Sequence, residues 1–268
     1  MTAPTHDGII PVLEHELKHV NRLLDTEVGF RERSVLNLAS KNLIAAAGSG
    51  TTIALAFTSN VASGATLAAS ATCGSGTATC TFSDSQSNTW VTAQTITDID
   101  NGLRCYSGYA KNAAAGATTV TATFSIAGDF RCITIHEVSG ADTTAPLDGN
   151  SGQFQAAAIG TATDGISSTN LTTTANGCYI FGSTYTYNAD NAIAAGTGYT
   201  GRESVDIASN LFTLQSEDKI QAVAGATAAT FTSGFDNNTA LTVALAFKPA
   251  AAGGTTHPGW SGNFGGWF

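Results

Sequence analysis

A strict alternation of apolar and polar residues in the middle of the chain constrains the fold more than any other feature. In residues 119–124, Val120, Ala122 and Phe124 share one face and three threonines share the other. Successive side chains of a β-strand point to opposite faces, so this pattern predicts a half-buried strand. Residues 131–138 repeat the alternation, which predicts a second strand.

Gly128 and Asp129 stand between these two runs and predict a tight turn that lets the strands pair antiparallel. Similar short runs, bounded by Gly, Asn and Asp, continue on both sides without helical periodicity. They predict an all-β fold, an antiparallel β-sandwich of jelly-roll or immunoglobulin type, over residues 43–248. The chain has 268 residues and no linker in its middle, which favours one large domain over two. Strands are expected at 51–58, 66–72, 77–82, 89–95, 103–110, 117–126, 130–138, 153–160, 168–174, 177–187, 211–215, 218–224, 227–233 and 240–248.

Residues 1–42 have a different pattern and are expected to form an N-terminal arm. Apolar residues spaced by four, three and four positions predict an amphipathic helix over about residues 11–28. An isolated helix of this length is marginal in water, so its apolar stripe must pack on something. Either it covers one end of its own sandwich, or it docks on a symmetry mate or a larger assembly. The stripe consists of Leu13, Leu17, Val20 and Leu24.

Residues 249–268 predict a flexible tail that combines glycines with large aromatic side chains. Each such side chain gains about 1.5–3 kcal/mol when it is buried. We therefore expect the tail to tuck against the domain or a neighbouring subunit, with binding of a distinct partner as the alternative. Its aromatic residues complete the predicted assembly interface: Trp260, Phe264, Trp267 and Phe268.

Charge and hydropathy argue against two classes of partner. The formal net charge is −9, and only 12% of the residues are charged. No Lys/Arg cluster could replace the counterions of a phosphate backbone, so no nucleic-acid partner is expected. The apolar runs are far shorter than the ~20 residues of a membrane-spanning helix, so no membrane partner is expected. The N-terminus lacks the pattern of a secretory signal, so the chain is expected either to be made and assembled in the cytoplasm or to have had a leader removed.

One motif matches a catalytic zinc site. His15, Glu16 and His19 fit H-E-x-x-H, which places two metal ligands one helical turn apart beside a general base. Only fourteen residues precede the motif, and Arg22 stands where the longer zinc-protease pattern requires glycine. The histidines are therefore interpreted as solvent-facing residues of the amphipathic helix, and no metal is predicted.

Asp98 begins a sequence that looks like a calcium loop. Tyr109 stands where the Glu at the twelfth position of that loop would be. Asn101 and Gly102 are better explained as a hairpin turn that leads into the next strand.

His136 and Glu137 are neighbours on a predicted strand, so their side chains point to opposite faces. They are expected to be a surface residue and a structural carboxylate. No nucleophile elbow, P-loop or dinucleotide fingerprint is present in the sequence. We therefore predict no enzyme, no catalytic residue and no cofactor.

The five cysteines have no zinc-type spacing, and their odd number favours free, buried thiols. Cys73 and Cys80 flank a Gly-Ser-Gly turn, and a disulfide between these two residues is the alternative.

Three segments carry a resemblance to a known family: YAKNAAAGATTVTATFS (109–125), HEVSGADTTAPLDG (136–149) and TALTVALAFKP (239–249). Through them, about residues 43–252 resemble a poorly characterised β-sandwich domain of phage virion proteins and of bacterial surface or exported proteins. The resemblance implies a fold more than a function, and no catalytic residue is carried over from it.

The resemblance implies a non-enzymatic structural component of a tailed-phage virion, such as a capsid decoration, a head fibre or a tail-associated protein. Its expected partners are other virion proteins, in a homo-oligomer anchored through the N-terminal arm. The alternative is a carbohydrate-binding or adhesin module of a bacterial surface protein, with a host-surface glycan as partner. Aromatic residues would then serve as sugar platforms: Trp90, Tyr106, Tyr109 or Tyr185.

Overall fold

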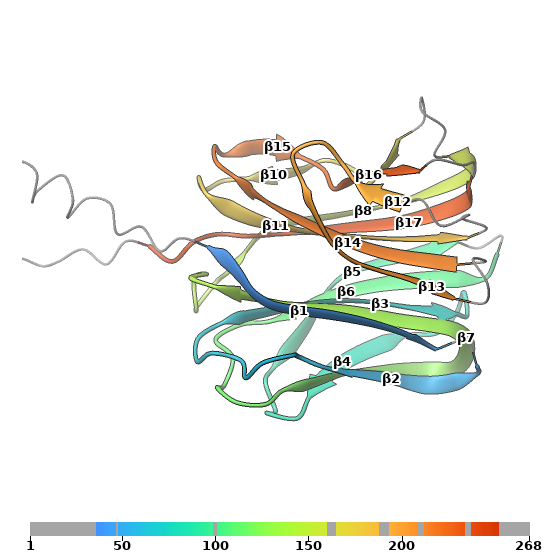
Figure 1. Cartoon of the computed structure of the whole chain (residues 1–268), viewed down its shortest axis with the longest axis horizontal. Helices are drawn as coiled ribbons and strands as arrows, with labels where there is room; N and C mark the ends of the chain where they lie inside the picture. The colour runs from blue at the N-terminus through green and yellow to red at the C-terminus, as the bar shows by residue number, and fades with distance from the viewer. Residues whose placement is uncertain are drawn as a thin grey trace, which may run out of the picture. The chain divides into compact units, whose positions relative to one another are not determined.

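The computed structural model describes residues 36–46, 48–98, 101–159, 165–187, 193–207, 212–233 and 237–251. They belong to one compact unit, Val35–Ala250. Every regular element in these ranges is a β-strand, and the strands pair antiparallel (Figure 1). The all-β, antiparallel prediction is therefore confirmed. No helix in the described part of the chain is long and apolar enough to cross a membrane.

The first half of the unit forms one sandwich. Its main sheet has the order β1-β7-β3-β6-β5, and an outer sheet forms where β2 and β4 pair with the N-terminal part of β7. Apolar side chains such as Leu55, Phe82 and Phe124 fill the space between the two sheets. The strands are β1 (Asn37–Ala46), β2 (Gly50–Ala56), β3 (Thr66–Gly74), β4 (Cys80–Asp84), β5 (Trp90–Asp98), β6 (Leu103–Ala110) and β7 (Thr119–Ser139).

The second half forms another sandwich. Its main sheet has the order β13-β14-β11-β17-β8, and it is covered by the three-stranded sheet β12-β16-β9 and the pair β10-β15. Ile166, Ile180 and Phe231 belong to the core between these layers. The strands are β8 (Leu147–Ile159), β9 (Ile166–Ser167), β10 (Leu171–Thr173), β11 (Cys178–Tyr187), β12 (Ile193–Ala195), β13 (Thr200–Ile207), β14 (Phe212–Gln221), β15 (Gly225–Thr227), β16 (Thr230–Ser233) and β17 (Asn237–Phe247).

The two halves have the same topology. The main sheet of the second half, read as β8-β17-β11-β14-β13, matches β1-β7-β3-β6-β5 strand for strand, and β9-β16-β12 matches β2-β7-β4. The sequence carries traces of the same repeat: AGAT occurs at 115–118 and 224–227, and ATF at 122–124 and 229–231. Gly64 and Gly177, which precede the equivalent strands β3 and β11, have φ values of 83° and 77°. The chain therefore contains an internal structural duplication.

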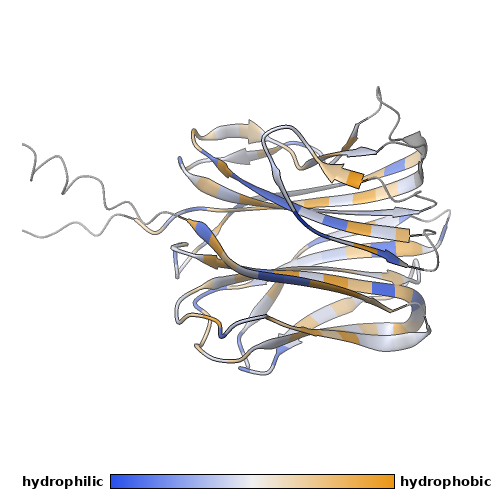
Figure 2. Cartoon of the chain, in the orientation of Figure 1, coloured by the Kyte–Doolittle hydropathy of each residue, from blue (hydrophilic) through white to orange (hydrophobic). Residues whose placement is uncertain are grey.

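The halves pack face to face through their main sheets, which gives four layers of strands (Figure 1). β1 contacts β13 at one edge and β5 contacts β8 at the other. In the matched strand orders, β8 is equivalent to β1 and β13 is equivalent to β5. The contact of β1 with β13 therefore corresponds to the contact of β8 with β5, and an approximate two-fold axis relates the halves. Hydrophobic residues recur along the strands of every layer (Figure 2). The core between the halves includes Leu103, Cys132, Phe181, Leu241 and Phe247.

The hairpin expected at Gly128 and Asp129 is wrong. Residues 119–139 form a single strand, β7, whose first part pairs with β2 and β4 and whose last part pairs with β1 and β3. Gly128 lies where the strand passes from one sheet to the other, and a Cβ atom there would be 2.9 Å from Cys73 Sγ and 3.2 Å from the Gly74 backbone, so the close approach requires glycine. A bend of this kind carries the same turn residues as a hairpin, so local sequence does not distinguish them.

The predicted boundaries need three further corrections. The β region begins at Asn37 rather than Leu43, so residues 37–42 belong to β1 and not to an arm. The strand β13 was missed because Gly and charged residues interrupt its pattern, and β12 was missed because three residues are too few to show an alternation. The expected single sandwich is a pair of sandwiches within one unit. The predicted helix at 11–28 and the tail from residue 252 lie outside the described residues.

All five cysteines are free and buried: Cys73, Cys80, Cys105, Cys132 and Cys178. The structure therefore has no disulfide between Cys73 and Cys80, which was the alternative prediction. Burial raises the pKa of the thiols of Cys80 and Cys105 to about 12, so they behave as small apolar residues of the core.

Candidate functional site

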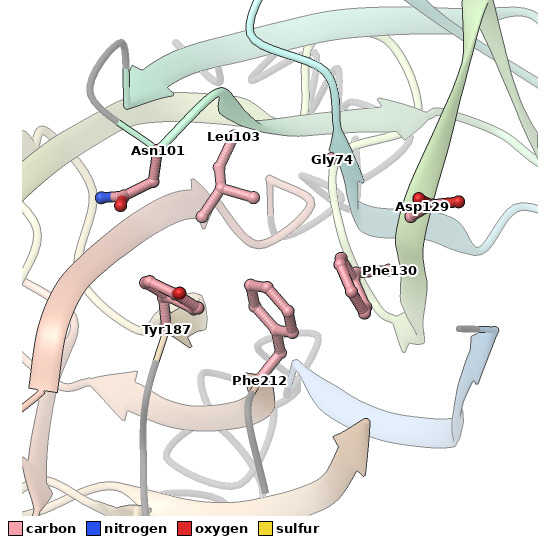
Figure 3. A pocket seen from close by; sticks show the side chains of 7 residues that line it. All are labelled: Gly74, Asn101, Leu103, Asp129, Phe130, Tyr187 and Phe212. Carbon is pink, nitrogen blue, oxygen red and sulfur yellow. The ribbon is translucent and has the colours of Figure 1, made fainter. Parts of the chain in front are cut away.

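A pocket of about 240 Å³ lies between the two halves, where the two-fold axis leaves the unit (Figure 3). Gly74 is the last residue of β3, and Tyr187 is the last residue of the equivalent strand β11. In the same way, Leu103 is the first residue of β6, and Phe212 is the first residue of the equivalent strand β14. Matching ends of both main sheets therefore form its wall. The lining residues are Gly74, Asn101, Leu103, Asp129, Phe130, Tyr187 and Phe212.

Three aromatic rings form a row along one wall of the pocket (Figure 3). The ring centroids of Phe130 and Phe212 are 4.2 Å apart, and those of Tyr187 and Phe212 are 4.9 Å apart. Tyr185 stacks on Phe212 from the core side, at 5.5 Å. Phe212 is buried, whereas Phe130 and Tyr187 are half-buried. The mutual contacts fix the orientation of the two rings that reach the pocket.

Phe130 has an unusual backbone conformation. Its φ is 52°, in the left-handed region that bulky residues avoid because the side chain approaches the backbone. Such a conformation costs about 1–3 kcal/mol and persists only where the surrounding structure imposes it. Here it accompanies the bend of β7, and it directs the ring toward Phe212 while Asp129 stays at the solvent-exposed rim.

Two polar residues stand at the rim of the pocket, Asp129 and Asn101, and both are exposed. The Asn101 backbone N–H and Nδ2 donate to the two carboxylate oxygens of buried Asp98, at 3.0 and 2.8 Å. Asp98 therefore orders the turn before β6, and the Oδ1 atom of Asn101 stays available as an acceptor. The carboxylate of Asp129 has no hydrogen-bond or ion-pair partner among the described residues, and no lining residue is cationic.

A second polar cluster is buried between the halves. His136 Nδ1 lies 2.9 Å from the Tyr179 hydroxyl, and its Nε2 lies 3.2 Å from Ser216 Oγ. The hydroxyl of Tyr179 donates to Asp218 at 3.0 Å, and Arg202 donates to both oxygens of the same carboxylate at 2.5 and 2.8 Å. His136 and Ser216 are fully buried, so no substrate reaches them. The expectation that His136 is a surface residue is wrong, because the main sheet is covered by the second half.

Two glutamates serve as structural acceptors. Glu137 lies on the opposite face of β7 from His136 and accepts the backbone N–H of Ala62 at 2.7 Å, which confirms its predicted role. Glu217 accepts the backbone N–H groups of Gly196 and Thr230 at 3.0 and 2.9 Å. Burial raises the pKa of Glu217 to about 8 despite these two donors. Both side chains tie loops to the sheets.

Of the four aromatic residues predicted as sugar platforms, two are buried and two are half-buried. Tyr106 and Tyr185 are buried. Trp90 packs on Phe82 and donates its indole N–H to Asp84 at 2.7 Å. Tyr109 is half-buried, with its ring 5.8 Å from that of Phe247. Pattern alone did not show which aromatic residues face the core.

Several predicted features lie outside the described residues. They are the H-E-x-x-H motif and the complete assembly interface: Leu13, Leu17, Val20, Leu24, Trp260, Phe264, Trp267 and Phe268. Within the described ranges, no group of three or more His, Cys, Asp or Glu side chains is arranged to hold a metal ion.

The pocket itself was not found from sequence. Its residues come from five strand ends and turns that are far apart in the chain. One signal was available, because the repeated AGAT segments indicate a duplication, and ligand sites often form between such halves.

Comparison with known proteins yields no assignment: no protein-family model, no curated protein and no solved structure matches the chain.

Proposed function

We propose that this chain is a non-enzymatic structural component of a tailed-phage virion, anchored through its terminal segments. The observation that supports the proposal best is the position of the two ends of the folded unit. Asn37 pairs with Ser139, Ala141 pairs with Pro249, and the Ala250 N–H donates to Gly140 O at 2.9 Å. Residues 1–35 and 252–268 are therefore both joined to the same end of the unit.

This arrangement suits a displayed protein. The terminal segments carry the apolar stripe and the aromatic residues predicted as an assembly interface. The bend at Gly128–Phe130 lies in the middle of β7, next to Arg131, and Arg131–Ser139 is the part of β7 that pairs with β1. The bend and Ser139 are therefore at opposite ends of the β1–β7 pairing. A unit held at the Ser139 end would present the pocket end to solvent.

The finer topology is consistent with the proposal. The strand orders β1-β7-β3-β6 and β8-β17-β11-β14 favour a jelly roll over an immunoglobulin domain for each half. In the first half the long strand β7 pairs in both sheets, and in the second half the separate strands β16 and β17 take its two places. Jelly rolls are common in viral capsid proteins. The phage context, assembly in the host cytoplasm and the virion as final location come from the resemblance described above.

The buried chemistry also supports a structural role. The His136–Tyr179–Asp218 cluster and Glu217 bind neighbouring strands and loops, and solvent does not reach the histidine. These groups stabilise the packing between strands and loops.

The solution mass tests the proposal. Light scattering after size exclusion would compare the full chain with a chain of residues 36–250. The structure sets the start at Leu36, because a start at Leu43 would remove most of the pairing between β1 and β7. We expect an oligomer for the full chain and a folded monomer for the shortened one. A monomeric full chain would contradict anchoring through the terminal segments.

A further inference from the structure

We propose that the pocket between the two halves binds a single saccharide ring. The inference does not depend on the virion assignment, since it concerns only the folded unit. Ligand sites prefer interfaces between domains, and most take drug-sized molecules in about 300–1,000 Å³. The volume here, about 240 Å³, suits one ring rather than several.

The apolar wall matches the C–H face of a sugar. Phe130 and Tyr187 are half-buried, so each presents part of its ring to the pocket, and contacts with Phe212 hold both in place. Leu103 lies on the opposite side (Figure 3). An aromatic wall that is already ordered loses little conformational entropy on binding.

The polar rim matches the hydroxyl groups. Among the described residues, neither the Asp129 carboxylate nor Asn101 Oδ1 has a hydrogen-bond donor, and Asn101 Nδ2 donates to Asp98. Two acceptors from different segments of the chain suit a ligand with several O–H donors. None of the described residues that line the pocket is cationic, which disfavours phosphate and other anions.

A quaternary ammonium ion is the competing ligand, since aromatic rings and a carboxylate also attract cations. Such an ion has no hydrogen-bond donor for Asn101 Oδ1. The saccharide uses both rim acceptors, so the geometry favours it.

The test is ligand-observed NMR by saturation transfer on the full chain. The probes are the methyl glycosides of glucose, galactose, mannose and N-acetylglucosamine, with sorbitol and tetramethylammonium for comparison. We expect transfer to at least one glycoside and none to sorbitol, which has the hydroxyl groups but no ring. Absence of binding by all four glycosides, or binding of tetramethylammonium alone, would overturn the proposal.

Single substitutions test whether the glycoside binds in this pocket. Tyr187→Ala should weaken the glycoside by about tenfold, because an aromatic contact is lost, whereas Tyr187→Phe should stay within about twofold. Asp129→Asn should also weaken it; this residue is exposed and has no partner in the described structure, so the fold is retained. Asp142→Asn makes the same change at the Ser139 end, in a carboxylate that accepts the backbone N–H groups of Thr144 and Ala145; it should leave glycoside binding unchanged. Equal binding by Asp129→Asn, Tyr187→Ala and the native chain would contradict the assigned site.

Discussion

His136 and Tyr179, one from each half of the chain, are hydrogen-bonded across the interface at 2.9 Å, although 43 positions separate them. The tyrosine hydroxyl donates its proton to Asp218, so it must accept from the histidine. The Nδ1 atom of His136 therefore carries the proton, and Nε2 accepts from the Ser216 hydroxyl. This assignment makes His136 a neutral imidazole at the centre of the molecule.

Acid should destabilise the protein through His136. Burial lowers the pKa of this imidazole to about 3, so between pH 6.5 and 3 the unfolded chain binds a proton that the folded chain does not. The stability is complete above pH 6.5 and decreases as the pH falls toward 3, by on the order of 4 kcal/mol. Urea unfolding at pH 7, 5 and 4 would measure this decrease in the free energy of unfolding. His136→Gln removes the titrating group, and an unchanged pH slope in this variant would contradict the assignment.

Glu217 should have the opposite dependence. Burial raises its pKa to about 8, so the folded chain holds a proton that the unfolded chain has released. This stabilisation is complete below pH 4.5 and is lost as the pH rises through 8, on the order of 4 kcal/mol, the same size as for His136. Thermal unfolding between pH 5 and 9 should show that stability decreases less steeply with rising pH for Glu217→Gln than for the native chain. Lys219 is the comparison, because its charge lowers the pKa of Glu217; Lys219→Met should raise that pKa further and enlarge the contribution of Glu217.

Gly64 and Gly177 should respond alike to substitution, since they occupy equivalent turns with φ values of 83° and 77°. A Cβ atom at either position meets nothing closer than 3.7 Å, so the cost of alanine is conformational, about 1 kcal/mol. Chemical denaturation would compare Gly64→Ala and Gly177→Ala with Gly48→Ala, where φ is ordinary and a Cβ meets nothing within 4 Å. A large loss in only one of the pair would count against their equivalence.

The five thiols should be unreactive in the folded protein. All are buried, and burial raises the pKa of Cys80, Cys105 and Cys178 to about 12, so little thiolate exists at pH 8. Titration with a thiol reagent should detect none in native buffer and five in denaturant. A count of three in denaturant without reductant would indicate a disulfide instead.

Sequence patterns predicted most of the strands, because alternation follows directly from which side chains face a core. The strand at residues 103–110 was predicted with the bounds that the structure has. The same patterns failed for β12 and β13, which depend on pairing with β16 and β14 rather than on their own residues. They also failed at Gly128–Phe130, where a bend between sheets uses the residues of a hairpin turn.

The sequence by itself determined an acidic, all-β chain with structural carboxylates and buried thiols, since these properties depend on local composition and on the period of two residues along each strand. Only the tertiary structure decided that two sandwiches pack face to face, that His136 is buried between them, and that Phe130, Tyr187 and Phe212 meet in one pocket. Each of these features depends on which faces of distant strands come together. That choice is made by the free energy of burying whole sheets and not by any single segment.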